Sequence, residues 1–308
     1  MKDAGASSKA VRGHHLTWWD NYFAGRTLAE ITPERVAEAR DALAAEKFTR
    51  GKVQKKNGVE IAPTEYTHAG ATINRYLATL SHMFTMAVKE WRLVPTNPVR
   101  DITKKKERRG RVRFLSDSER NALLAACARS DWPALLTLVL LAISTGARRG
   151  ELINLQWDDV DLRVREASLD PQTGEVRAAL GHAIVRQTKN GETRVLPLVG
   201  KALEAPRALK LQGSASPWVF AQPSGLPGPY ENFDGVWYAA LEAAGIQDFR
   251  FHDLRHTTAS YLAAQGASLL EIADTLGHKT LSMVKRYSHL AQSHKVNAIE
   301  KMATERGL

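Results

Sequence analysis

Apolar side chains recur every three or four positions over long stretches of the chain, a spacing that predicts a mainly helical protein. One such stripe, between residues 72 and 91, consists of Ile73, Tyr76, Leu77, Leu80, Met83, Phe84 and Ala87. From Pro133 to Ser144 nearly every residue is apolar, so we expect a helix that is buried on all sides. The two stretches lie far apart in the sequence and indicate two separate hydrophobic cores.

Other segments depart from the helical pattern. Residues 183–197 predict a β-hairpin, because Asn190-Gly191 between two apolar runs is the strongest signal for a two-residue hairpin turn. Residues 49–61 predict a loop, and the small, polar and basic residues 1–13 predict a disordered N-terminus. The fold class is therefore expected to be mainly α, with a small antiparallel β-sheet in the C-terminal domain.

Several helix ends are marked by capping residues. Thr32 followed by Pro33 predicts a helix start, and Ser268 followed by Glu271 has the form of a capping box. Gly266 and Gly277 are expected to end two short helices near the C-terminus. The second of these stops would place His278 at a helix-terminal turn.

Composition narrows the class of protein. The chain has 308 residues, 44% of them hydrophobic, which is enough for about two folded domains. Its net charge of +10 favours a polyanionic partner, although charge alone does not separate nucleic acid from a membrane surface. No apolar run reaches the length of a membrane span. The single cysteine, Cys127, excludes a disulfide framework or a zinc cluster within the chain.

The charge is concentrated in one short segment between the two expected cores. Its basic residues are Lys104, Lys105, Lys106, Arg108, Arg109, Arg111 and Arg113. A cationic tether of this kind would lie along a phosphate backbone, where the release of condensed counterions drives binding. The simpler interpretation, a solvated flexible linker, applies to the same residues.

Four motifs carry candidate chemistry. Thr145 to Leu152 reads TGARRGEL and follows the buried helix directly. Further along come His252-Asp253-Leu254-Arg255, then Leu276-Gly277-His278, and nine residues later Tyr287. Singly, each is an ordinary helix-surface or core residue, but the ordered set at these spacings is far more specific.

This set resembles the active-site boxes of the tyrosine recombinases, the phage integrase family, in the form TGxRxxEL, HxxR, LGH and Tyr. The helical stretch that ends in Trp91 and the Asn97-Pro98 turn also resembles the core-binding domain of phage integrases. The resemblance implies a two-domain architecture. Its expected parts are a disordered start (1–13), a helical core-type DNA-binding domain (14–101), a basic linker (102–113) and an α+β catalytic domain (114–308) with a C-terminal tail (288–308).

The resemblance also implies a role for each residue. The transition state of a phosphodiester reaction carries extra negative charge, which two permanently charged guanidiniums can stabilise. Arg148 and Arg255 match that pair, with Glu151 supporting Arg148. Tyr287 matches the nucleophile, Lys189 in the hairpin turn the general acid, His252 a proton-transfer group and His278 a phosphate ligand. Neither a metal nor any other cofactor is expected, because the phosphotyrosine intermediate conserves the bond energy.

The expected partners follow from this chemistry. They are double-stranded DNA at recombination or attachment sites and three further copies of the chain in a homotetramer on DNA, with accessory DNA-bending or directionality factors as further candidates. No membrane partner is expected, and the expected location is the cytoplasm, on the nucleoid during action. Many phage integrases carry an arm-site-binding domain before the core-binding domain. Here only about thirteen residues precede it, so either the chain reads core sites alone or its start has been lost.

Alternatives remain open. A type IB topoisomerase uses the same chemistry but would relax DNA that lacks any cognate site. A DNA-binding regulator would need only the charge and the helical domain, and would have no use for the catalytic set. An RNA- or membrane-binding protein is disfavoured by the lack of RNP aromatics and of a basic amphipathic helix. Among recombinases, a phage or mobile-element integrase is preferred to a chromosome-dimer-resolving enzyme.

Overall fold

The computed structural model divides the chain into two compact units, unit 1 from Met1 to Gly110 and unit 2 from Arg111 to Leu308. The parts of the chain that the structure describes are residues 6–50, 54–56, 59–61, 64–107, 111–165, 168–169, 176–177, 180–186, 193–213, 215–291, 300 and 302–306. Within these residues, no helix combines the length and the apolar character that crossing a bilayer requires.

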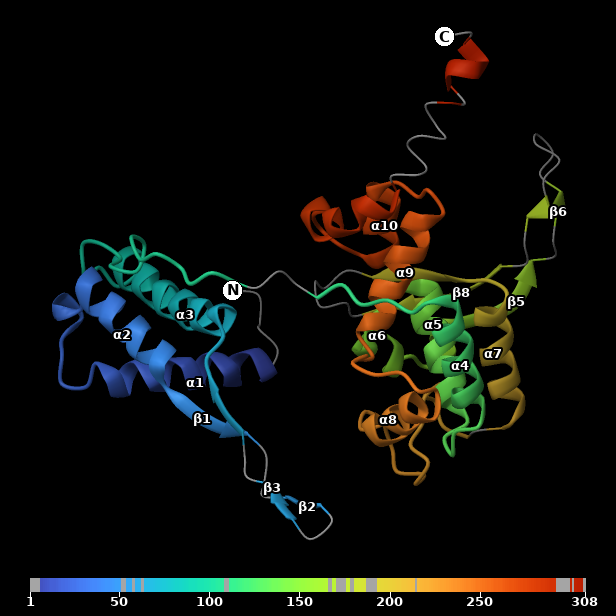
Figure 1. Cartoon of the computed structure of the whole chain (residues 1–308), viewed down its shortest axis with the longest axis horizontal. Helices are drawn as coiled ribbons and strands as arrows, with labels where there is room; N and C mark the ends of the chain where they lie inside the picture. The colour runs from blue at the N-terminus through green and yellow to red at the C-terminus, as the bar shows by residue number, and fades with distance from the viewer. Residues whose placement is uncertain are drawn as a thin grey trace. The chain divides into compact units, whose positions relative to one another are not determined.

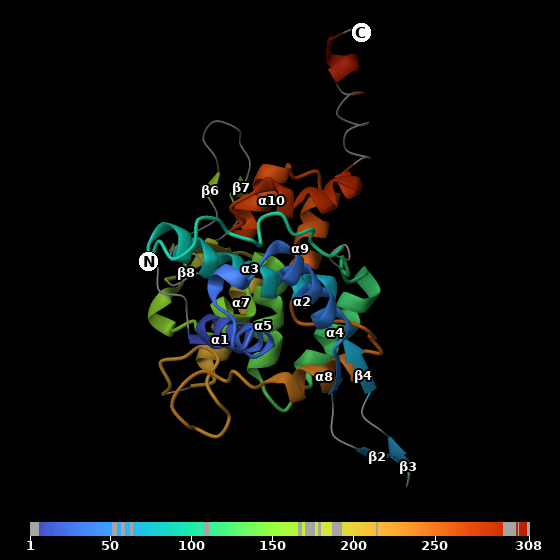
Figure 2. The same ribbon diagram turned by 90° about the vertical axis from the view of Figure 1, so that its left-hand side faces the viewer.

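Unit 1 is built on three helices, which Figures 1 and 2 show as one bundle. They are α1 (Ala6–Tyr22), α2 (Pro33–Ala45) and α3 (Gly70–Lys89), with the short 3-10 turn η1 (Leu28–Glu30) between the first two. The stripe predicted on α3 packs against Trp19 and Leu43 of the other two helices. Thr32 caps α2 as expected, because its side chain accepts a hydrogen bond from the amide of Arg35.

The prediction that residues 1–13 are disordered is wrong from Ala6 onward, since α1 begins there. The reason lies further along the same helix. His15 is buried and hydrogen-bonded to Thr79 at 3.0 Å, and Trp19 donates from its ring nitrogen to the carbonyl of Tyr76. These anchors hold the helix on the core, so its polar first turns continue an element that is already formed.

The expected loop at residues 49–61 is also wrong where the structure describes it. Strand β1 (Lys47–Arg50) pairs antiparallel with β4 (Thr64–Thr67), and β2 (Gln54–Lys56) pairs with β3 (Val59–Ile61). β-Branched and aromatic residues such as Phe48 and Tyr66 favour strands. Their rings face each other across β1 and β4 with centroids 6.2 Å apart, a cross-strand pair that the lysine-rich composition of the segment hides.

Unit 2 is organised around α5 (Ala134–Thr145), the helix predicted to be buried. Around it lie α4 (Asp117–Ala128), α6 (Arg149–Ile153), α7 (Lys201–Leu211), α8 (Asp234–Ala243), α9 (Asp253–Ala264) and α10 (Leu269–Leu276). The 3-10 turns are η2 (Trp157–Asp159), η3 (Leu281–Met283) and η4 (Lys285–Ala291). Nine of the twelve residues of α5 are buried, because α4, α7 and α9 all pack against this helix.

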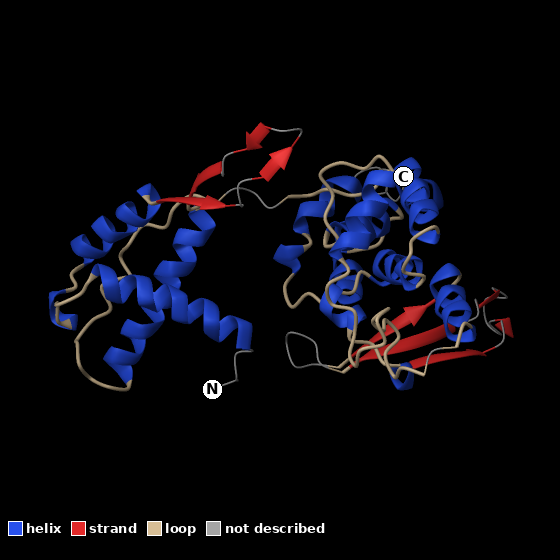
Figure 3. Ribbon diagram, turned by 90° about the horizontal axis from the view of Figure 1, so that it is seen from below, coloured by secondary structure: helices blue, strands red, loops and turns tan. Residues whose placement is uncertain are grey.

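A three-stranded antiparallel sheet lies along one side of these helices (Figure 3). Its order is β5 (Val160–Arg165), β8 (Leu180–Val185) and β9 (Arg194–Leu198), and a separate pair is formed by β6 (Ser168–Leu169) and β7 (Val176–Arg177). The predicted hairpin is confirmed as β8 and β9, with Ile184 opposite Val195. Its turn, with Lys189, Asn190 and Gly191, lies outside the described residues.

Candidate active site

Arg148 stands where the buried helix α5 ends. Gly146 ends α5 in the left-handed conformation (φ +60°), and a Cβ there would lie 2.4 Å from the side chain of Leu276. Arg148 then begins α6 as its N-cap residue, and Glu151 accepts hydrogen bonds from its amide at 2.9 Å and its guanidinium at 2.5 Å. Burial opposes ionisation of Glu151, but these bonds and the charge of Arg194 hold its pKa below the ordinary value. The carboxylate therefore fixes the guanidinium in place.

Arg255 brings a second guanidinium to the same place. Its side chain comes from α9, is 4% exposed and donates to the carbonyl of Gly146 at 2.6 Å. Thr258, one turn later, donates to the carbonyl of Ile143 at 2.7 Å. Burial and repulsion from Arg148 and Arg194 lower the pKa of Arg255 to about 10. Two cations forced together in this way favour an anion between them.

His278 follows the C-terminal cap of α10. Ser268 caps the start of α10 and Gly277 ends it in the left-handed conformation, both as predicted. The amide of His278 donates back to the carbonyl of Ala273 at 2.8 Å, while Arg148 reaches the carbonyl of Gly277 at 3.4 Å. Burial, followed by the charges of Arg255 and Arg148, lowers the pKa of His278 to about 4. The imidazole thus lies within the field of both arginines.

Tyr287 is buried, with 2% of its surface exposed, in the small core that α9, α10 and η4 share. Burial raises the pKa of its hydroxyl, against the opposing charges of Arg286 and Arg255. The hydroxyl contacts Nδ1 of His256. His252, the histidine expected to exchange a proton with the tyrosine, is exposed at the N-terminus of α9, and its ring centroid lies 5.5 Å from that of His256.

His256 is a residue that sequence reasoning missed. Burial and the neighbouring charge of His252 lower its pKa to about 4, so its imidazole is neutral at ordinary pH and can accept a hydrogen bond from Tyr287. A signal was present, because His252 and His256 are four residues apart and such positions share a helix face. Arg194 of β9 is a second missed residue, and its charge acts on both Arg255 and Glu151.

Several basic residues of the linker are paired with carboxylates of unit 1 or unit 2. The Lys105 ammonium pairs with Asp41 at 2.6 Å, and its backbone is bonded on both sides to Asn74. Arg111 pairs with Asp248 and Asp253, and Arg113 pairs with Glu119. Lys104 and Lys106 are exposed, whereas Arg108 and Arg109 lie outside the described residues. The part of the expected linker whose charges are available to a partner is therefore shorter than residues 102–113.

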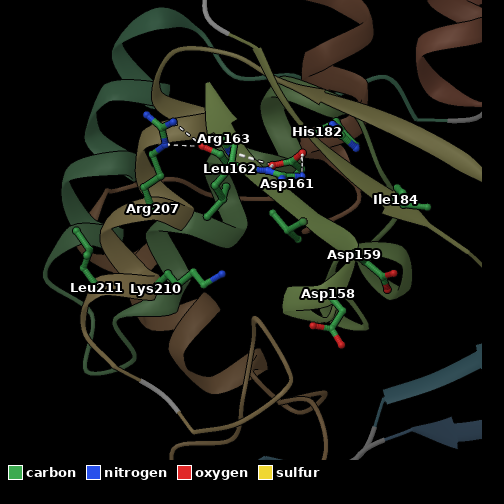
Figure 4. A pocket seen from close by; sticks show the side chains of 11 residues that line it. Asp158, Asp159, Asp161, Leu162, Arg163, His182, Ile184, Arg207, Lys210 and Leu211 are labelled. Atoms are coloured by element: carbon green, nitrogen blue, oxygen red, sulfur yellow. Dashed lines mark hydrogen bonds and ion pairs between the residues drawn. The ribbon is translucent and has the colours of Figure 1, made fainter. Parts of the chain in front are cut away.

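A cavity of about 700 Å³ in unit 2 lies apart from this cluster, beside β5, β8 and α7 (Figure 4). Several of its charged groups are bonded to neighbours: Asp161 pairs with Arg163 at 2.9 Å, and Arg207 donates to the carbonyl of Leu162 at 3.0 Å. None of the candidate catalytic residues that the structure describes lines it. Among the described residues, no group of His, Cys, Asp and Glu has an arrangement that could hold a metal ion.

Comparison with known proteins identifies the family. Residues 113–294 match the Phage integrase family. The chain is 30% identical over 297 residues to the integrase of Salmonella phage P22, covering 91% of this chain and 71% of that protein. It is also 30% identical over 278 residues to a shufflon-specific DNA recombinase of Escherichia coli, covering 89% of this chain and 62% of that recombinase.

Solved structures agree on the fold. A lambda integrase(75-356) dimer bound to a COC' core site matches with a TM-score of 0.67 at 19% identity, covering 94% of this chain and 91% of that one. The Tn1549 transposon integrase in complex with transposon right end DNA matches with a TM-score of 0.69 at 14% identity, covering 99% and 96%. The family match and the P22 relative, with which the fold agrees, show that the chain belongs to the phage integrase family and is a site-specific tyrosine recombinase.

Proposed function

We propose that this chain cleaves and rejoins double-stranded DNA through a covalent bond between DNA and Tyr287. The observation that carries the proposal is the convergence of Arg148 with Arg255, His278 and the buried tyrosine, which follow it by more than a hundred residues, in one electrostatically coupled cluster. Two guanidiniums suit a phosphate that gains charge in its transition state, and the cluster has no comparable use in a protein that only binds DNA.

The reaction consists of two transesterifications. The Tyr287 oxygen attacks the scissile phosphorus, the bond to the 5′ oxygen breaks, and a 3′-phosphotyrosyl link forms. Lys189 donates the proton that the departing 5′ oxygen needs. The proton of Tyr287 passes to an imidazole. The contact between Nδ1 of His256 and the Tyr287 hydroxyl supports His256 as the first acceptor, and His252 lies beside it. A 5′ hydroxyl from the partner duplex then reverses these steps and restores a phosphodiester.

The partners are proposed from the relatives. The lambda and Tn1549 integrase structures are DNA complexes, and we propose that this chain likewise binds DNA at specific sites, with unit 1 and the catalytic unit both in contact with the duplex. Strand exchange between two duplexes requires four active sites, so the working form is a homotetramer, aided by accessory DNA-bending or directionality factors. We place its action in the cytoplasm, on the nucleoid, as an integrase of a phage or another mobile element.

The test is Tyr287→Phe, which removes the nucleophile and keeps the ring. The variant should bind site-containing DNA as well as the parent protein but form no covalent complex on a nicked suicide substrate in denaturing gels. Tyr261→Phe, which changes a partly buried tyrosine of α9, serves as the control and should retain the complex. Undiminished covalent complex in Tyr287→Phe would overturn the assignment.

A further inference from the structure

Arg194 is a buried cation outside the recognised catalytic set. It begins β9, and only 14% of its side chain is exposed. Its Nε and Nη2 atoms have neither exposed surface nor a hydrogen-bond partner among the described residues. Burial lowers the pKa of Arg194, and the nearby carboxylate of Glu151 opposes that shift. A guanidinium held in such a place carries a desolvation cost, so the contacts that it makes need a reason.

Among the described residues, the one hydrogen bond that the Arg194 side chain donates goes to the turn that carries His278. At the end of α10 the amides of Gly277 and His278 return to the carbonyls of Asp274 and Ala273, at 2.8 Å each. This arrangement leaves the carbonyl of Leu276 without a partner inside the helix. Nη1 of Arg194 donates to that carbonyl at 2.8 Å, which places a cation at the negative end of the helix.

The Leu276–His278 turn has a glycine where the Arg194 guanidinium approaches the backbone. A Cβ on Gly277 would lie 2.7 Å from Nη1 of Arg194, closer than real Cβ atoms come to other atoms. The glycine thus serves both the left-handed backbone (φ +63°) and the approach of the arginine. Arg148 contacts the next carbonyl, that of Gly277, at 3.4 Å. Two consecutive carbonyls before His278 are therefore held by two guanidiniums.

Glu151 provides the counter-charge for both. Its carboxylate lies 2.5 Å from Arg148 and 3.8 Å from Arg194. Arg194 also stands at the base of the hairpin, five positions after Lys189. One side chain thus joins the sheet, the carboxylate that holds Arg148 and the turn that presents His278.

Building on the proposed function, we propose that Arg194 is a positioning residue for the cleavage reaction, which holds the Leu276–His278 turn so that His278 meets the scissile phosphate. It is not itself a phosphate ligand, because its two unbonded nitrogens have no accessible surface. Displacement of a catalytic group by about 1 Å can slow a reaction about 10²-fold. A loss of that size is expected when the carbonyl of Leu276 loses its donor.

The test measures single-turnover cleavage of a suicide substrate by Arg194→Ala, Arg194→Lys and Arg163→Ala, each in the full chain. Arg163 is a matched control, because it lies in the same sheet but its side chain is 90% exposed. Arg194→Ala should cleave about 10²-fold more slowly, with site binding in gel shifts unchanged. Arg194→Lys keeps a donor to one carbonyl and should recover part of the rate, whereas Arg163→Ala should match the parent protein.

A double-mutant cycle separates positioning from general damage. If Arg194 acts through the turn, adding Arg194→Ala to His278→Ala should slow cleavage by less than about threefold, since the residue that it positions is already gone. A further loss of about 10²-fold in that background, or unchanged cleavage by Arg194→Ala alone, would overturn the inference. Absence of cleavage by the parent protein and by Arg163→Ala would instead refute the proposed function, so the two failures are distinct.

Discussion

Among the described histidines, His256 and His278 are those whose protonation the fold opposes most strongly, with pKa values of about 4 against an ordinary 6.5. Burial is the main cause for both, and the surrounding positive charges add to it. When DNA binds, a phosphate beside Arg148 and Arg255 would cancel part of that field. We therefore expect the pKa of His278 to rise in the complex, which links DNA binding to proton uptake.

The same shifts predict how the stability of the free protein depends on pH. The unfolded chain takes up a proton on each histidine near pH 6.5, whereas the folded chain does so only near pH 4. The contribution of these two histidines to stability is thus full above pH 6.5, falls as the pH drops through this window, and levels off below pH 4. Urea unfolding between pH 7.5 and 4 should show a smaller decline in stability for His256→Gln than for the parent protein. Equal declines in the two proteins would contradict the assigned burial.

Lys189 is testable although it lies outside the described residues. Lys189→Ala should slow cleavage of ordinary DNA roughly 10²–10⁴-fold, the usual contribution of general acid catalysis. A sulfur leaving group is a much weaker base and hardly needs a proton. DNA with sulfur at the bridging 5′ position should restore cleavage by Lys189→Ala but not by Arg148→Ala. If sulfur rescues neither variant, another residue is the acid.

Single residues were predictable where their neighbours in the sequence decide their place. Arg148 follows a buried helix and a glycine turn, and Glu151 is one helical turn away, so their pairing is visible in the sequence. The contacts of His256 and Arg194 are not, because their partners Tyr287 and Leu276 lie 31 and 82 positions away. Such contacts depend on how α9, α10 and β9 pack, which spacing alone does not specify.

At the scale of elements, helix ends were predicted more reliably than strands. Ser268 and Gly277 act through hydrogen bonds within a few residues, so the local sequence contains the whole interaction. Strands β1 and β4 of unit 1 depend on pairing across a longer separation, as between Phe48 and Tyr66. The extent of the linker could not be predicted from the sequence for the same reason. Asn74 and Asp41, which bind Lys105, belong to helices that are distant in the sequence.

The linker yields a prediction with an internal control. Lys104 and Lys106 are exposed, whereas the ammonium of Lys105 is paired with Asp41. Replacing both exposed lysines by alanine should reduce the slope of log K against log salt by about 1.8, at about 0.9 per lost phosphate contact. Lys105→Ala removes a charge already satisfied by the protein and should leave the slope nearly unchanged. An unaltered slope in the double variant would mean that this segment only tethers the two units.

At the scale of the whole molecule, the tail after Tyr287 either packs on its own unit or contacts a second copy of the chain. Residues 302–306 are helical and Met302 is exposed, while Val296 and Ile299, which complete the apolar stripe of the tail, lie outside the described residues. The catalytic unit also exposes three large apolar side chains on α10 and η3, which are Leu270, Leu281 and Met283. We propose that the tail of one copy docks on such a surface of the next copy in the tetramer. The simpler interpretation is that it packs on its own unit.

Truncation after Leu290 distinguishes docking on a neighbouring copy from packing on the tail's own unit. Leu290 packs against the core around Tyr287, so this end point keeps that core and removes only the tail. If the tail docks on a neighbour, the truncated chain should bind a single site almost as tightly as the full chain, because the groups proposed to hold one duplex precede residue 288. It should fail to bring two sites together and to recombine them, since a nucleophile followed by a segment held by a neighbour becomes active only when that neighbour is present.

Gel shifts measure single-site binding by the truncated chain, and a two-site synapsis assay measures whether it brings two sites together. Loss of single-site binding together with synapsis would show that the tail belongs to the core of its own unit, and that cleavage is not coupled to assembly in this way.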